Sequence, residues 1–158
     1  MAADARVGAI VVAHNGGDAL IACVESLMGQ SLANLEVIVV DNASTDGSVE
    51  RLRPRLGSRL RVIWRQSNGG YAAGANTGWK ATDAPYVAVL NQDVTLQADC
   101  LARMWQVLLE ARRHALVSPK LVLTSDPAHV NAIGNERGDG SIMIVVATDA
   151  PLSDRNLH

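Results

Sequence analysis

The sequence has few cysteines and no long apolar segment, and both absences narrow the class of protein. Cys23 and Cys100 are its only cysteines, and they form no CxxC pair. Both lie in apolar helical patterns, so we expect small buried side chains rather than a zinc site or a disulfide framework. No stretch reaches the roughly 18 apolar residues of a membrane-spanning helix. The N-terminus also lacks the pattern of a signal peptide, so we expect a cytoplasmic protein.

The positive charge is almost entirely arginine, because Lys80 and Lys120 are the only lysines. Six arginines fall within one short segment, residues 51–65. Such a run can face an anionic ligand or a lipid surface, which leaves peripheral association with a membrane open. A solvated helix and loop face explains the same pattern more simply. The net charge of −2 argues against a dedicated nucleic-acid binder, so no nucleic acid is expected as a partner.

Three common catalytic or nucleotide-binding motifs are also missing. No GxGxxG follows the first apolar strand, which excludes the dinucleotide-binding fold. Gly69 and Gly74 have P-loop spacing, but Ala75-Asn76 stands where that loop requires Lys followed by Ser or Thr. No GxSxG is present to form a nucleophile elbow. His14 lies near a strand end, where a histidine is more often a packed or hydrogen-bonded side chain than a base, so no catalytic role is assigned.

The apolar pattern predicts one α/β domain. Hydrophobic residues make up 48% of the 158, which is enough for a real core. Continuous apolar runs predict buried strands at residues 7–13, 35–40, 60–64 and 86–90. Helical patterns follow at about residues 18–28 with Asp18 as the cap, 48–53 with Pro54 expected to end or bend the helix, 71–81 and 98–114. This alternation predicts a mostly parallel sheet with helices on both faces.

Weaker patterns occur elsewhere in the chain. Pro119 confines any strand within residues 117–123 to a sheet edge or a strand start, and residues 142–147 form another possible strand. Glycines recur every fourth residue at Gly70, Gly74 and Gly78. Close packing on the sheet and close approach of the backbone to a ligand both explain this stripe.

All four predicted strands end in polar clusters. These clusters are His14-Asn15, Asp41-Asn42, Asn68-Gly69-Gly70 and Asn91-Gln92-Asp93. The carboxyl ends of parallel strands meet at one edge of a sheet, where open α/β folds bind ligands. Asp93 can hold a divalent cation there, since Mg²⁺ and Mn²⁺ prefer oxygen ligands and often bind with a phosphate. A plain turn explains one such cluster taken alone, but four converging clusters predict a ligand cleft.

Four ordered motifs at these strand ends resemble those of family 2 glycosyltransferases. They are His14-Asn15, VVDNASTDGS at residues 39–48, NGGYAAGANTG at 68–78 and LNQDV at 90–94. Over about residues 7–123 the sequence is similar to the branch that includes bacterial rhamnosyltransferases and other cell-surface polysaccharide transferases. The resemblance implies a GT-A fold, with a nucleotide-sugar-binding subdomain at residues 1–125. Residues 126–158 would then be an incomplete acceptor-side segment or a tail.

The resemblance also implies roles for individual residues. Asp41 would hold the base and ribose, and its carboxylate suits the imide N–H of uracil or thymine; Asp46 would lie close by or cap a helix. Asn91-Gln92-Asp93 stands in place of the family's DxD motif, with Asp93 as the ligand of Mg²⁺ or Mn²⁺. The residues expected to bind the nucleotide sugar are Ala13, His14, Asn15, Asp41, Asn42, Asn68, Gly70, Asn91 and Gln92. Because Asn91 replaces the first Asp, we expect weaker metal binding than with two carboxylates.

The implied reaction is inverting transfer from a UDP- or dTDP-sugar, with dTDP-rhamnose favoured. The acceptor would be a hydroxyl of a glycan or lipid-linked glycan at the cytoplasmic face of the membrane. The family takes its general base from a Glu-Asp pair well beyond the metal motif, and no such pair follows Asp93, so no catalytic residue is assigned. A catalytically incomplete nucleotide-sugar-binding module is therefore the alternative. A nucleotidyltransferase fits less well, since it would need a glycine-rich loop with Arg and Lys after the first strand.

Overall fold

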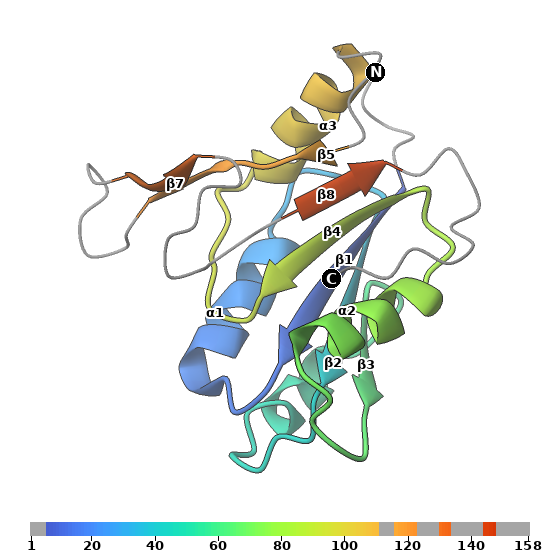
Figure 1. Ribbon diagram of the computed structural model, residues 1–158, viewed down its shortest axis with the longest axis vertical. Coiled ribbons are helices and arrows are strands. Elements are labelled where there is room, and N and C mark those ends of the chain that lie inside the picture. Colours follow the sequence, from blue (N-terminus) through green and yellow to red (C-terminus); the bar gives the residue numbers. More distant parts are fainter. Residues whose placement is uncertain (1–5, 111–115, 123–129, 134–143, 148–158) are drawn as a thin grey trace.

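The computed structural model describes residues 6–110, 116–122, 130–133 and 144–147 (Figure 1). Its centre is a six-stranded sheet with the order β3-β2-β1-β4-β8-β5. Four strands run parallel: β1 (Val7–Ala13), β2 (Leu35–Asp41), β3 (Leu60–Trp64) and β4 (Tyr86–Asn91). β8 (Ile144–Ala147) runs antiparallel to β4, and β5 (Leu116–Val117) antiparallel to β8. β6 (Lys120–Val122) and β7 (Val130–Ile133) form a separate antiparallel pair.

Helices cover both faces of the parallel strands. α1 (Gly17–Met28) and α3 (Cys100–Glu110) pack on one face, and α2 (Tyr71–Lys80) packs on the other (Figure 1). A 3₁₀ helix, η1 (Glu50–Arg55), follows β2 and buries Leu52 in the same cluster as α1. The chain therefore has the three-layer arrangement that alternating strands and helices predict.

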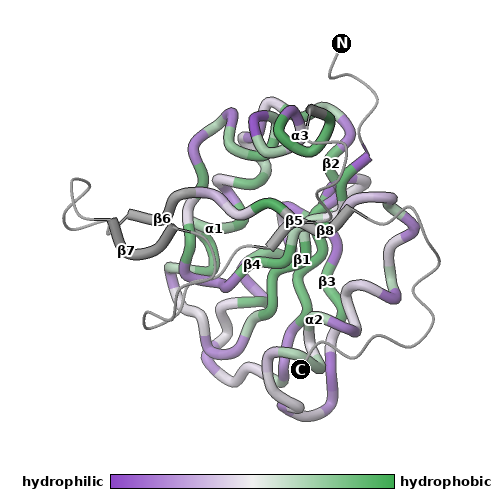
Figure 2. The backbone as a smooth tube through the Cα atoms, turned by 45° about the horizontal axis from the view of Figure 1, so that its top comes forward, coloured by the Kyte–Doolittle hydropathy of each residue, from purple (hydrophilic) through white to green (hydrophobic). Residues whose placement is uncertain are grey.

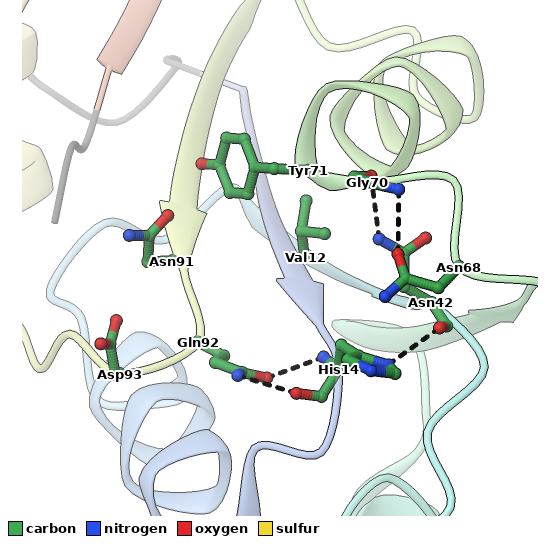
Figure 3. A pocket seen from close by; sticks show the side chains of 9 residues that line it. All are labelled: Val12, His14, Asn42, Asn68, Gly70, Tyr71, Asn91, Gln92 and Asp93. Carbon is green, nitrogen blue, oxygen red and sulfur yellow. Dashed lines mark hydrogen bonds between the residues drawn. The ribbon is translucent and has the colours of Figure 1, made fainter. Parts of the chain in front are cut away.

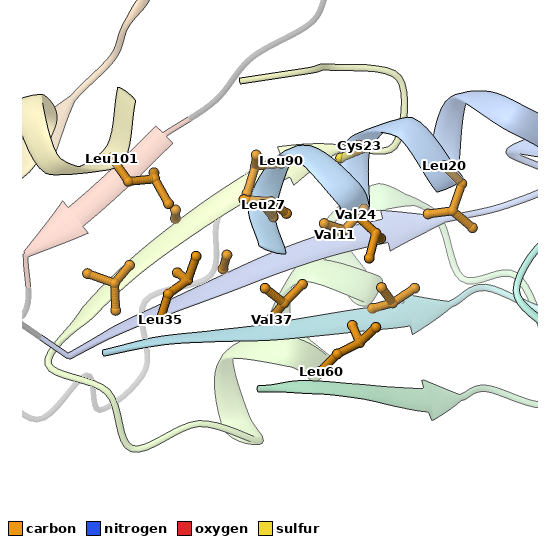
Figure 4. Close-up of a cluster of buried hydrophobic side chains, with 14 of the residues drawn as sticks. Val11, Leu20, Cys23, Val24, Leu27, Leu35, Val37, Leu60, Leu90 and Leu101 are labelled. Carbon is orange, nitrogen blue, oxygen red and sulfur yellow. The ribbon is translucent and has the colours of Figure 1, made fainter. Parts of the chain in front are cut away.

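Side chains of each parallel strand alternate between two apolar clusters. In β1, Ala9 and Val11 face α1, whereas Ile10 and Val12 belong to the cluster that includes Ala75 of α2. Figure 4 shows the larger cluster between α1 and the strands. Because both faces are covered, the strands are apolar along almost their whole length, as the green segments at the centre of Figure 2 show.

The strand order places a ligand-binding edge between β1 and β4. β2 and β3 are added on one side of β1, and β4 then lies on its other side. In open α/β sheets ligands bind beyond the carboxyl ends of the strands where this order reverses. The topology therefore predicts a ligand site at the ends of β1 and β4, at Ala13 and Asn91.

The predicted fold class and the four parallel strands are confirmed, with β2 and β4 each one residue longer than expected. Asp18 is not the cap of α1. The N-cap is Gly16 without a side-chain cap bond, and Asp18 instead pairs with Arg51 of η1. Pro54 does not end η1, which continues to Arg55, because i→i+3 bonding avoids the clash with the i−4 carbonyl that proline causes in an α-helix.

Two further expectations concern the chain after α3. α3 is described as far as Glu110, and residues 111–114 of the predicted helix lie outside the described residues. β7 lies where no strand was predicted, whereas β8 falls within the strand expected at 142–147. Across the described ranges, no helix has the length and apolar character needed to cross a membrane.

Three of the six arginines in residues 51–65 are paired with acidic side chains. Arg51 binds Asp18 and Arg55 binds Glu25, so η1 is tied to α1. Arg61 binds Glu36 of the neighbouring strand. These pairs reduce the positive charge available to an anionic surface, which supports the interpretation as a solvated helix and loop face.

The glycine stripe of α2 serves close packing at Gly78. A Cβ added there would lie 2.4 Å from Ile10 Cγ2 and 3.1 Å from Val40 Cγ2. Gly78→Ala is expected to lower the free energy of unfolding by about 1 kcal/mol, because overpacking outweighs the gain in helix propensity. Denaturant unfolding would measure this, with Gly57→Ala as control, since no atom lies within 4 Å of its added Cβ. Unchanged stability of Gly78→Ala would contradict the packing role.

Candidate functional site

A pocket of about 310 Å³ opens at the carboxyl ends of β1 and β4, where the strand order reverses (Figure 3). Its walls come from all four predicted polar clusters. The lining residues are Val12, His14, Asn42, Asn68, Gly70, Tyr71, Asn91, Gln92 and Asp93. The convergence expected from parallel strands is thus present in the structure.

Gln92 joins the end of β4 to the end of β1. Its Oε1 accepts a hydrogen bond from the His14 backbone N–H at 2.8 Å, and its Nε2 donates to the His14 carbonyl at 3.0 Å (Figure 3). The amide of Gln92 is therefore engaged with the protein, although the residue lines the pocket.

Asn42 joins the remaining strand ends, and it is only 2% exposed. Its carbonyl lies 3.0 Å from His14 Nδ1, and its side-chain Nδ2 donates to the Gly70 carbonyl at 2.9 Å. Its Oδ1 accepts a hydrogen bond from the Arg65 guanidinium. A line of hydrogen bonds thus runs from Gln92 through His14 and Asn42 to Gly70, connecting all four clusters.

The loop before α2 depends on Gly70. This residue has φ 85°, a conformation that side chains disfavour, and its N–H donates to Asn68 Oδ1 at 2.9 Å. Gly70 is also the N-cap of α2 and has no side-chain cap bond. Since Gly70 and Tyr71 both line the pocket, the N-terminus of α2 lies beside it, where helix N–H groups favour a negative charge.

Asp93 is the only carboxylate among the lining residues. It is exposed and forms no ion pair with a described residue. Tyr71 is 44% exposed, and partial burial first, with the negative charge of Asp93 second, raises the pKa of its phenol to about 12, so the phenol stays protonated at neutral pH. The same two causes raise the pKa of Cys23 to about 12, and its thiol donates to the Asn91 carbonyl at 3.6 Å.

The donor atoms at the end of β4 fit a hard cation that arrives with a diphosphate. Asp93 supplies a carboxylate and Asn91 an amide oxygen, and Mg²⁺ is often held by one or two carboxylates together with substrate phosphates. Within the described part of the chain, no group of three or more His, Cys, Asp or Glu side chains could hold a metal ion alone. A metal held by Asp93 and Asn91 would take its further ligands from water or from phosphate oxygens.

The loops after β1 and β2 bind each other. The Asn15 N–H donates to Ser44 Oγ at 3.1 Å, and Asn15 Oδ1 accepts from the Thr45 N–H at 2.8 Å. Asp46 Oδ2 accepts from the Gly17 N–H at 3.0 Å, joining the same two loops at the start of α1. Hydrogen bonds from Ser48 are the main cause of the lowered pKa of the Asp46 carboxyl.

Three residues expected to bind the nucleotide sugar do not line the pocket. Ala13 is fully buried at the end of β1, and Asn15 is used in the loop contacts. Asp41 is 4% exposed, and its Oδ1 accepts the Ser44 N–H at 2.9 Å. Conversely, Val12 and Tyr71 line the pocket without having been predicted as site residues. Tyr71 directly follows the Asn68-Gly69-Gly70 cluster, a signal that could have identified it.

The residues that form the sheet and the pocket match a known protein family. The family model described as "Glycosyl transferase family 2" matches residues 9–132. ExoO of Rhizobium meliloti, a succinoglycan biosynthesis protein, is 33% identical over 95 residues, which is 60% of this chain and 27% of ExoO.

Solved structures share the fold. The match to TarS (1–349) of S. aureus covers 85% of this chain and 38% of the TarS chain, with a TM-score of 0.65 and 23% identity. Its complex with UDP-GlcNAc also matches, with a TM-score of 0.60 and 24% identity over 70% of this chain and 33% of that one. PcManGT, a mannosyltransferase of Pyrobaculum calidifontis in complex with GDP-Man and Mn²⁺, has a TM-score of 0.54 and 27% identity, covering 59% of this chain and 29% of its own. The chain thus spans well under half the length of each of these proteins.

Proposed function

The chain belongs to glycosyl transferase family 2, and we propose that it is the donor-binding half of a metal-dependent, inverting transferase that uses a nucleotide sugar. One observation carries this proposal: side chains from four strand ends meet in one pocket and are joined by hydrogen bonds. Residues 1–125 would be the nucleotide-sugar-binding subdomain and residues 126–158 an acceptor-side segment, much of which lies outside the described residues.

The proposed donor is a UDP- or dTDP-sugar, with dTDP-rhamnose as one candidate. Asn42, Asn68 and Gly70 would border the nucleotide and its diphosphate, beside the N-terminus of α2. Asp41 would accept the imide N–H of the base through the oxygen that Ser44 does not use. The complex of TarS with UDP-GlcNAc supports a uridine nucleotide, whereas the complex of PcManGT with GDP-Man makes guanine the competing base.

Mg²⁺ or Mn²⁺ is the proposed cofactor, held by Asp93 with help from Asn91. The Mn²⁺ in the PcManGT complex supports this assignment. When bound, such an ion neutralises charge on the departing nucleoside diphosphate. The protonated Tyr71 phenol, at the same end of the pocket as Asn91, can donate a hydrogen bond to the donor (Figure 3).

The proposed acceptor is a hydroxyl of a glycan or lipid-linked glycan, used in cell-surface polysaccharide synthesis at the cytoplasmic face of the membrane. The similarity to ExoO, named for succinoglycan biosynthesis, supports a polysaccharide product. A catalytically incomplete nucleotide-sugar-binding module is the second candidate. It is favoured by the single carboxylate of the pocket, Asp93, which is assigned to the metal and leaves no lining carboxylate as a base.

Calorimetric titration with UDP, dTDP, CDP and GDP, each with and without Mn²⁺, tests the donor assignment. We expect UDP and dTDP to bind more tightly than CDP and GDP, and Mn²⁺ to strengthen their binding. Preference for GDP would contradict the pyrimidine assignment to Asp41. Release of sugar from a bound UDP- or dTDP-sugar would favour the transferase over the incomplete module.

A further inference from the structure

The side chain of Gln92 extends the hydrogen bonding between β1 and β4 beyond the end of their backbone pairing. The parallel register of β1 and β4 ends at the pair Val12 and Asn91. One residue later, the Gln92 amide bonds both the N–H and the carbonyl of His14, at 2.8 and 3.0 Å. A primary amide has the donor and acceptor of a peptide group, so Gln92 occupies the place of a further strand residue.

Space for this amide depends on Gly16. A Cβ added to Gly16 would lie 2.5 Å from Gln92 Oε1 and 2.8 Å from Leu20 Cβ. The backbone of Gly16 has φ −82°, which any residue can adopt, so its glycine is not needed for backbone conformation. The missing side chain instead leaves room for the Gln92 amide and for Leu20.

These contacts join the part of the pocket proposed to bind the metal to the part proposed to bind the nucleotide. Gln92 directly precedes Asp93, the proposed metal ligand, and its amide bonds His14, whose ring lies 3.0 Å from the Asn42 carbonyl. A change in the position of Gln92 would therefore move Asp93 relative to the residues that border the nucleotide.

We infer that Gln92 is a positioning residue that couples metal binding to nucleotide binding, rather than a ligand of the nucleotide sugar. The inference rests on the proposed function, since it concerns the same pocket. The inference predicts a coupling free energy between the two ligands. Mn²⁺ should strengthen nucleotide binding more in the wild-type protein than in a protein without the Gln92 contacts.

Gln92→Met tests this inference, because methionine has a similar length and makes neither hydrogen bond. UDP affinity is measured by calorimetry with and without Mn²⁺, and the ratio of the two affinities gives the coupling. We expect the ratio to fall about fivefold to tenfold, the effect of losing one to two hydrogen bonds. Gln97→Met is the matched control, since Gln97 is exposed in the same loop and does not line the pocket.

A second variant, Gly16→Ala, displaces the Gln92 amide without altering Gln92 itself. It should reduce the same ratio, and combining it with Gln92→Met should reduce the ratio no further. An unchanged ratio in Gln92→Met, in a protein that binds UDP with Mn²⁺, would overturn the inference and leave the proposed function intact. If the wild-type protein bound no nucleoside diphosphate under either condition, the proposed function and the coupling would both fail.

Discussion

Asp93→Ala is expected to abolish the strengthening of UDP binding by Mn²⁺ and to leave metal-free UDP binding nearly unchanged. Asp93 is the only carboxylate among the lining residues, and a single carboxylate with substrate phosphates is a usual site for a hard cation. Its removal should cost at least about tenfold in metal-dependent affinity, the loss that even an outer-shell partner of a metal can cause.

Asp99→Ala is the matched control for Asp93→Ala. Asp99 lies in the same loop region, pairs with Arg103 on the surface and does not line the pocket. Titration of each variant with UDP at constant Mn²⁺, and then in a chelator, separates the metal-dependent part of the UDP affinity from the rest. The metal assignment would be wrong if Asp93→Ala kept the full response to Mn²⁺.

Asn42→Ala is expected to weaken both the fold and nucleotide binding, whether or not metal is present. The side chain is buried and bonds both Gly70 and Arg65, so its removal takes an acceptor from the Arg65 guanidinium and leaves the Gly70 carbonyl with the Gly74 N–H alone. The expected loss in the free energy of unfolding is about 2–3 kcal/mol. Because Gly70 begins α2 beside the pocket, UDP affinity should fall in chelator as much as in Mn²⁺.

Asn68→Ala provides the comparison for stability. Asn68 is exposed, and its Oδ1 accepts one hydrogen bond, from the Gly70 N–H, so its loss should cost under about 1 kcal/mol. Denaturant unfolding of both variants measures the difference. Equal stability of Asn42→Ala and Asn68→Ala would show that Asn42 does not hold the strand ends together.

The parallel strands were predictable because burial on both faces requires continuous apolar runs. Val7–Ala13 illustrates this, since all seven of its residues are buried. The place of the pocket was predictable as well, because the parallel strand directions alone bring His14, Asn42 and Asn91 to one edge of the sheet. Strand β7, in contrast, is a short run of four residues before a polar, glycine-rich segment, and it depends on pairing with β6, which local sequence does not reveal.

The partner of each polar side chain was not predictable, because hydrogen-bond partners come from tertiary contacts. Asn15 and Asp41 looked equivalent to Asn42 in the sequence, yet Asn15 binds the loop after β2 and Asp41 binds Ser44. Asp18 had the pattern of a helix cap, but the nearby Arg51 pairs with it. The role of Tyr71 on the pocket wall likewise depends on how Gly70 turns the chain into α2.

Amide NMR spectra recorded with UDP and Mn²⁺ would test most directly whether the four strand ends form one nucleotide and metal site. UDP alone should shift the amides of His14, Asn42 and Gly70, and paramagnetic Mn²⁺ should then broaden those nearest Asp93 most strongly. Amides at the opposite edge of the sheet, such as Asn34 and Asp83, should be unaffected by either ligand. Shifts centred on that opposite edge, or broadening centred away from Asp93, would contradict the account.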